Sequence, residues 1–186
     1  ADMKRIDAAL PTIKYILDNG ASIILLSHLG RIKTEEDKKS KSLKIVADKL
    51  KEMLSNKITF INETRSKEIT KAAKSLKPGE ILFLENTRFE DLNKKAESSN
   101  NPTLAKYWAS LGDVFVNDAF ATAHRAHAST VGIANYVKES ALGFLMEEEV
   151  KELSKLLKGF KRPFISIIGG AKVSDKLKVL EKLFTI

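Results

Sequence analysis

The sequence predicts an α/β fold in which a doubly wound, mostly parallel sheet carries helices on both faces, giving a three-layer αβα arrangement. Three observations support this prediction. Short apolar runs recur along the chain, and they are continuous rather than alternating. Segments with the apolar spacing of helices lie between these runs, and the links that join them are short. Strands and helices that alternate in this way are typical of a parallel sheet wound with helices.

Five apolar runs are predicted to be strands. Each is rich in Ile, Val, Leu or Phe, and continuous runs of this length are typical of strands that are covered on both faces. The predicted strands are Ser22–Leu26, Ile58–Ile61, Ile81–Leu84, Val114–Val116 and Phe164–Ile168.

Helices are predicted between the strands, because apolar residues there recur at a spacing of three to four. The first predicted helix, Pro11–Asn19, ends at an Asn-Gly pair that is typical of a C-terminal cap. Another begins at Asn101-Pro102, an N-cap residue followed by proline at the first helical position, and ends at Gly112. The remaining predicted helices are Ser42–Leu54, Ser66–Leu76 and Glu147–Leu157.

The composition is that of a globular protein. The 186 residues are 43% hydrophobic and 30% charged and include no cysteine, which excludes a disulfide-stapled miniprotein and a disordered tail. No apolar run approaches the roughly 20 residues of a membrane-spanning helix. The first residues lack the apolar core of a signal peptide. We therefore expect a cytoplasmic location and no membrane partner.

The net charge of +8 is unevenly divided between lysine and arginine, because only six of the 32 basic residues are arginine. Scattered lysine is typical of a solvated surface. Arginine has a planar fork that grips carboxylate or phosphate at two points, so each arginine suggests a specific role. The arginines are Arg5, Arg31, Arg65, Arg88, Arg125 and Arg162.

Histidine and arginine gather in the segments that follow the predicted strands. His28 and Arg31 follow the first strand, Arg88 follows the third, and a His124-Arg125-Ala126-His127 string follows the fourth. In wound α/β folds, ligands bind beyond the carboxyl ends of the strands. We therefore predict that these side chains surround a small anion, and that Arg5 joins them from the start of the first helix.

The last segment combines a strand, a glycine pair and two lysines. Gly169 and Gly170 would let a phosphate approach the backbone, and Lys172 and Lys176 lie four residues apart, on one face of a helix. The string matches neither the P-loop nor the dinucleotide fingerprint. Zinc-hydrolase and nucleophile-elbow motifs are absent from the sequence. A metal site at His124 and His127 is disfavoured by the intervening Arg125, so no metal ligand is predicted.

Six ordered strings, RIDAALPTI, SHLGR, LENTRF, GDVFVNDAF, AHRAH and GGAKVSDK, resemble the phosphoglycerate kinase family from about Arg5 to the last residue. The resemblance implies a glycolytic transferase that moves a phosphoryl group between 1,3-bisphosphoglycerate and ADP, giving 3-phosphoglycerate and ATP with Mg²⁺. No nucleic acid would take part, and a monomer is expected.

The resemblance also implies roles for particular residues. It assigns the clamp for the phosphate and carboxyl end of the substrate to the matched positions Arg5, His28, Leu29, Gly30, Arg31, Arg88 and Arg125. It assigns nucleotide binding to Gly169, Gly170, Lys172 and Lys176. Arg5, Lys172 and Lys176 would be catalytic, with His124 and His127 in support.

The domain organisation follows from the same resemblance. Residues 1–145 would be a phosphoglycerate-binding domain without the family's first strand, residues 146–160 an interdomain helix and link, and residues 161–186 the start of a nucleotide-binding domain. Because the family's magnesium ligand and most of its nucleotide pocket are not matched, the isolated chain is expected to be inactive. Because the family's first strand is not matched either, the chain is expected to have unpaired strand edges and weakened stability.

Two positions depart from the family pattern, and one competing function is retained. Ala121 replaces a glycine and would restrict the loop if that glycine had positive φ, and Ile32 replaces a common proline. The alternative to the kinase is a non-catalytic basic module that binds nucleic acid or another polyanion. The low aromatic content of 7% gives that module no evident base-stacking platform.

Overall fold

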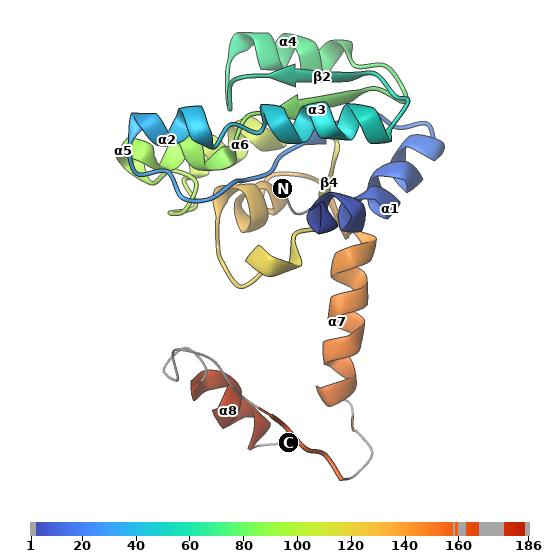
Figure 1. Cartoon of the computed structure of the whole chain (residues 1–186), viewed down its shortest axis with the longest axis vertical. Helices are drawn as coiled ribbons and strands as arrows, with labels where there is room; N and C mark the ends of the chain where they lie inside the picture. Colours follow the sequence, from blue (N-terminus) through green and yellow to red (C-terminus); the bar gives the residue numbers. More distant parts are fainter. Residues whose placement is uncertain (1–2, 158, 160–162, 168–176, 185–186) are drawn as a thin grey trace. The chain divides into compact units, whose positions relative to one another are not determined.

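The computed structural model describes residues 3–157, 159, 163–167 and 177–184. They divide into two compact units, Ala1–Met146 and Glu147–Ile186. Within the described residues no helix is both long enough and apolar enough to cross a lipid bilayer. Figure 1 shows the elements in chain order. The strands are β1 (Ile23–Leu25), β2 (Ile58–Ile61), β3 (Ile81–Leu84), β4 (Val114–Asn117) and β5 (Glu139–Leu142).

In the first unit one helix precedes the first strand, and the other helices lie between the strands. The α-helices are α1 (Lys4–Asp18), α2 (Glu35–Ser40), α3 (Lys44–Met53), α4 (Lys67–Ser75), α5 (Asp91–Lys94) and α6 (Pro102–Ala109). Short 3₁₀ segments form η1 (Thr87–Glu90) and η2 (Phe120–Thr122), and a π-helical turn forms η3 (Ala128–Gly132). Two helices follow, α7 (Phe144–Leu157), which begins in the first unit, and α8 (Leu177–Leu183) in the second.

All strand pairs among the described residues are parallel, as the sequence predicts. One sheet has the order β1-β3-β2, and β4 pairs with β5 in a second sheet. In the first sheet Ile58 and Ile23 both lie opposite Ile81, and Ile61 lies opposite Leu84. The central strand β3 is completely buried, which explains why its sequence is apolar without alternation.

Helices cover both faces of the three-stranded sheet, which confirms the three-layer prediction (Figure 1). On one face Ile81 and Phe83 pack with residues of α1 and α3, and on the other Leu82 and Leu84 pack with Ile69 of α4. Neighbouring residues of β3 thus face opposite layers, as the two-residue period of a strand requires. Two separate apolar clusters result, one on each face of the sheet.

The predicted cap at Asn101 is confirmed, and Ser66 caps α4 in the same way. Asn101 accepts a hydrogen bond from the Leu104 backbone N–H at 3.1 Å, and Ser66 accepts one from Ile69 at 3.2 Å. Gly20 has φ of +77° directly after the C-cap Asn19, as predicted for an Asn-Gly stop. The predicted start of the first helix at Pro11 is wrong, because α1 begins seven residues earlier at Lys4 and contains Pro11. Proline removes one backbone donor without ending this helix.

Two strand predictions require correction. Within residues 163–167 no strand is present, and Ile165 and Ile167 are 78% and 94% exposed. An apolar run forms a strand only when a neighbouring strand pairs with its backbone, and the described residues supply none there. Val114 of β4 was predicted to be buried but is 53% exposed, because β4 pairs only with β5 among the described residues.

The two departures from the family pattern are accommodated locally. Ala121 lies in η2, and Lys95 and Asn100 are the non-glycine residues with positive φ among those described. Ala121 therefore does not occupy the left-handed region, and the loop gains no strain from its side chain. Ile32 is 7% exposed and contributes to the buried apolar residues.

Candidate functional site

The candidate site begins where β1, β3 and β4 end. Ser27–Arg31 follows β1, Glu85–Arg88 follows β3, and a longer segment that contains Arg125 and His127 follows β4. The carboxyl ends of β1 and β3 lie at the same edge of their sheet, because the two strands are parallel. That edge is where an α/β fold places a ligand.

Arg88 is the most deeply buried cation of the site. It lies in η1, directly after the buried strand β3, and is only 8% exposed. The Asn86 side chain fixes its backbone by accepting a hydrogen bond from the Arg88 N–H at 3.1 Å. Its guanidinium Nη1 lies 3.8 Å from Asp91 Oδ2, a separation that gives an ion pair and no hydrogen bond. The guanidinium therefore keeps hydrogen-bonding capacity for an anionic ligand.

Asn86 joins the segment after β1 to Arg88. Its side-chain amide donates to the backbone oxygens of Leu29 and Lys41, each at 2.9 Å, and it has no exposed surface. The adjacent Glu85 is also fully buried and accepts hydrogen bonds from Leu43 N, Ser42 Oγ and Asn86 N at 2.7, 2.5 and 2.7 Å. These contacts hold the loop that carries His28 against the turn that carries Arg88.

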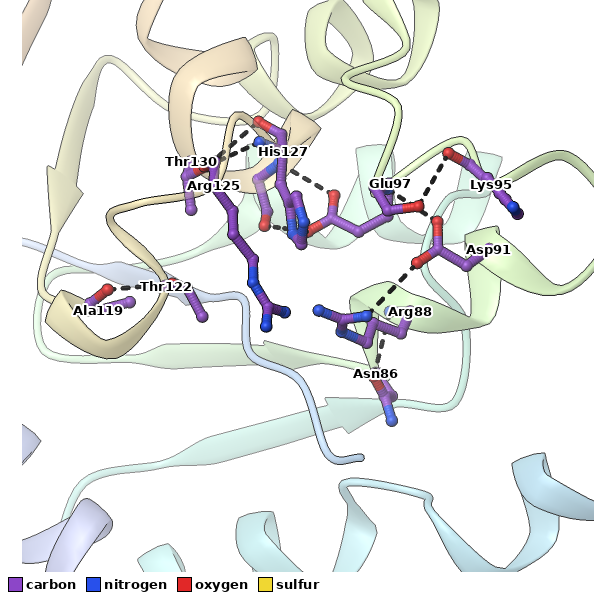
Figure 2. A network of polar contacts seen from close by, with 12 residues as sticks. Asn86, Arg88, Asp91, Lys95, Glu97, Ala119, Thr122, Arg125, His127 and Thr130 are labelled. Atoms are coloured by element: carbon purple, nitrogen blue, oxygen red, sulfur yellow. Dashed lines mark hydrogen bonds and ion pairs between the residues drawn. The ribbon is translucent and has the colours of Figure 1, made fainter. Parts of the chain in front are cut away.

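Arg125 belongs to a segment that is held at several backbone positions. Its N–H donates to Thr122 O at 2.9 Å, and its carbonyl accepts from Thr130 Oγ1 at 3.0 Å. Its Nε donates to His124 Nε2 at 3.1 Å. In Figure 2 the guanidinium groups of Arg125 and Arg88 point toward one another from their separate segments. Two like charges that face each other in this way favour an anion between them.

The electrostatics of His28 indicate which cations share the site. Burial, followed by Arg88, Arg5, His127 and Arg125, lowers the pKa of His28 to about 4. The same causes act on His127, whose pKa is lowered by burial and then by Arg88 and Arg125. These histidines are therefore neutral near pH 7 and offer hydrogen bonds without adding to the positive charge.

Comparison with known proteins decides the family. The family model described as phosphoglycerate kinase matches residues 1–186. The chain belongs to the phosphoglycerate kinase family. Phosphoglycerate kinase of Enterococcus faecalis is 60% identical over 179 residues, which are 96% of this chain and 45% of that protein. Phosphoglycerate kinase of Mycoplasmopsis pulmonis is 59% identical over 181 residues, 97% of this chain and 24% of that protein.

A solved structure extends the comparison to three dimensions. The structure of phosphoglycerate kinase from Coxiella burnetii is 40% identical and superposes with a TM-score of 0.83, covering all of this chain and 45% of that one. The chain thus spans less than half the length of these relatives.

In this family member the structure brings together most of the predicted substrate-binding residues. Arg5, Arg88, Arg125 and His127 all lie near enough to His28 to lower its pKa. Three further predicted residues shape the site through the backbone or through a neighbour. The carbonyl of Leu29 accepts a hydrogen bond from Asn86, and Gly30 adopts a positive φ of +64°. His124 accepts a hydrogen bond from Arg125.

Two groups of predicted residues are not brought into this cluster. Arg31 is exposed, its carbonyl accepts a hydrogen bond from Lys41 Nζ at 2.7 Å, and it is not among the charged groups that lower the pKa of His28. The predicted nucleotide-binding residues Gly169, Gly170, Lys172 and Lys176 lie outside the described residues.

Sequence reasoning missed the buried polar residues that hold the site. Glu85 and Asn86 have no exposed surface, and Glu97 is 2% exposed. The available signal was that Glu85 and Asn86 are polar and directly follow a continuous apolar strand. A polar residue at such a buried position needs hydrogen-bond partners for its polar atoms. Glu97 lies in a polar stretch that resembles an ordinary loop, so no signal marked it.

The depressed pKa of His28 predicts a measurable pH dependence. Its pKa falls from 6.5 to about 4 on folding, so its contribution to stability is present above pH 6.5 and is lost as the pH falls toward 4. Between about pH 7 and pH 5 the unfolding free energy of His28→Gln should fall less than that of the parent chain, with a difference of roughly 1 kcal/mol. The difference is small because solvent screens this half-buried ring. Urea unfolding at the two pH values measures the difference, and equal losses would contradict the assignment.

Proposed function

We propose that the described site binds the phosphorylated acid in the phosphoglycerate kinase reaction, in which a phosphoryl group passes between 1,3-bisphosphoglycerate and ADP. The observation that carries this proposal is the convergence of Arg5, Arg88 and Arg125 on His28. A ligand with a phosphate at one end and a carboxyl group at the other matches such a set, because guanidinium forks grip both groups at two points.

The chemistry of the reaction explains why the site is cationic. In the direction of ATP formation, a terminal oxygen of ADP attacks the acyl phosphate, the bond between phosphorus and the acyl oxygen breaks, and the 3-phosphoglycerate carboxylate leaves with the electron pair. Charge spreads over the phosphoryl and acyl oxygens during this step, so positioning and charge neutralisation supply most of the catalysis. Arg5, at the start of α1, is proposed to act at the reacting end, while Arg88 and Arg125 hold the substrate.

The nucleotide side of the reaction is also proposed. Gly169 and Gly170 would admit phosphates close to the backbone, and Lys172 and Lys176 would contact the transferred group. Mg²⁺ would accompany ATP or ADP. The described residues contain no group of three or more His, Cys, Asp or Glu side chains that could hold a metal ion, so no step is assigned to them through a metal.

The domain roles follow as part of the same proposal. Residues 1–145 would bind the phosphoglycerate, residues 146–160 would form the link, and residues 161–186 would begin the nucleotide-binding domain. The separation of the chain into compact units at Met146 and Glu147 supports this division.

A ligand-discrimination experiment separates this function from a basic module that binds polyanions. We expect the chain to bind 3-phosphoglycerate at least about 10-fold more tightly than inorganic phosphate, because a two-ended ligand engages more arginines. We also expect the affinity for 3-phosphoglycerate to change little with salt concentration. The affinity of a protein for nucleic acid falls by about 10³-fold or more between about 50 and 200 mM salt when it makes six or more phosphate contacts. Calorimetric titration measures both. Tight oligonucleotide binding with no preference for 3-phosphoglycerate would favour the module.

A further inference from the structure

Glu97 is a buried carboxylate outside the arginine cluster, and it joins two segments that are distant in the sequence. Its side chain accepts a hydrogen bond from Ser129 N at 3.0 Å and another from Ser129 Oγ, and its backbone oxygen accepts from Ala128 N at 2.9 Å. Ser129 lies 32 residues further along the chain, in the π-helical turn η3. Three hydrogen bonds at one residue thus fix the start of η3.

The segment that Glu97 fixes is the one that carries Arg125. His127 precedes η3 directly, its Nδ1 lies 3.6 Å from Glu97 Oε1, and it is 8% exposed. Thr130 of η3 donates to the carbonyls of Arg125 and His127 at 3.0 and 3.3 Å. A shift of η3 would therefore move the backbone of Arg125 with it.

Glu97 is also tied to the segment that carries Arg88. The neighbouring residues Ala96 and Ser98 donate backbone hydrogen bonds to Glu90 O at 3.0 Å and to Asp91 Oδ1 at 2.8 Å. Asp91 in turn forms the ion pair with Arg88. Figure 2 shows this continuous path from Arg88 through Asp91 and Glu97 to the Arg125 segment.

The carboxylate is retained in a place where burial disfavours its charge. Burial raises the pKa of Glu97, while the Ser129 hydrogen bonds and the nearby Arg88 oppose that rise. A buried carboxylate is costly unless its hydrogen bonds are satisfied. Here Ser129 satisfies it, and this attaches η3 to the segment that Ala96 and Ser98 tie to Glu90 and Asp91.

We propose that Glu97 is a positioning residue of the anion site: its carboxylate fixes the Arg125 segment against the Arg88 segment and so sets the separation of the two guanidinium groups. The inference rests on the proposed binding of 3-phosphoglycerate, because a changed separation of the guanidinium groups is detected as a changed affinity for that ligand.

Glu97→Gln is the principal test, because it keeps the shape of the side chain while it removes the charge and one acceptor. We expect the dissociation constant for 3-phosphoglycerate, measured by calorimetry on the 186-residue chain, to rise about 10-fold. Glu68→Gln, an exposed carboxylate of α4, is the matched control and should leave that affinity unchanged.

A double-mutant cycle separates positioning from a general structural defect. On an Arg125→Lys background the cost of Glu97→Gln should fall below about 3-fold, because a flexible lysine depends less on the placement of its backbone. On an Arg31→Ala background the full cost of about 10-fold should remain. An equal cost on both backgrounds would overturn the inference.

Ser129→Ala covers the case in which Glu97→Gln does not fold. It removes one donor to the carboxylate and should weaken 3-phosphoglycerate binding by about 3-fold, with the same dependence on Arg125. Unchanged binding in this variant would then refute the positioning role.

If the parent chain itself shows no preference for 3-phosphoglycerate over inorganic phosphate, the proposed function fails. If the parent shows that preference and the Glu97 variant binds equally well, this inference alone fails.

Discussion

Arg88→Ala is expected to weaken 3-phosphoglycerate binding by about 100-fold, because a truncated hydrogen-bonded charge at a buried site commonly costs about 2–5 kcal/mol. Arg88 is 8% exposed and is fixed at its backbone by Asn86. Water therefore cannot easily replace its guanidinium. Calorimetric titration with 3-phosphoglycerate measures the loss.

Arg88→Lys is the matched variant for that measurement. Lysine keeps the positive charge but lacks the planar fork, so we expect a loss of about 10-fold rather than 100-fold. A second readout is independent of the ligand. Among the charged groups, Arg88 lowers the pKa of His28 the most. That pKa should therefore rise in Arg88→Ala, and NMR titration of the imidazole measures the change. Unchanged ligand affinity together with an unchanged His28 pKa would contradict the site.

Gly132→Ala is expected to destabilise the fold by about 2–4 kcal/mol, because the added methyl group overpacks a buried contact. A Cβ at this position would lie 2.4 Å from Asn100 Oδ1 and 2.7 Å from the Cβ of Ala105, which is completely buried on α6. Gly132 closes the π-helical turn η3, so the clash would also displace the segment that carries Arg125.

Gly112→Ala is the control for that substitution. A Cβ at Gly112 would meet nothing within 4 Å, so its effect on stability should stay within about 0.5 kcal/mol. Urea unfolding followed by circular dichroism compares the two variants. Equal stability of the two alanine variants would show that η3 is not packed against α6 as described.

The fold was predictable wherever burial controls the sequence. The predicted strands Ile58–Ile61 and Ile81–Leu84 coincide with β2 and β3, because both lie in the covered sheet. The strand β5, Glu139–Leu142, was not predicted, since all four of its residues are exposed and give no apolar pattern. The run Phe164–Ile168 has the apolar pattern of a strand, but no strand pairs with it among the described residues. An apolar pattern does not show whether a partner strand is present.

The site was predictable for its charges and not for the residues that hold them. Arg88 and Arg125 were marked because arginine is rare in this chain and follows strands. Asn86 and Glu97 act through hydrogen bonds to segments 57 and 32 residues away. Such contacts depend on the way the chain folds back on itself, which the local sequence does not encode.

A crystal structure of the chain with 3-phosphoglycerate tests the central claim most directly. The account predicts that the ligand lies between Arg88 and Arg125, beside His28, with guanidinium nitrogens about 2.7–3.2 Å from its phosphate or carboxylate oxygens. A ligand bound to surface lysines, with Arg88 and Arg125 free of it, would contradict the account.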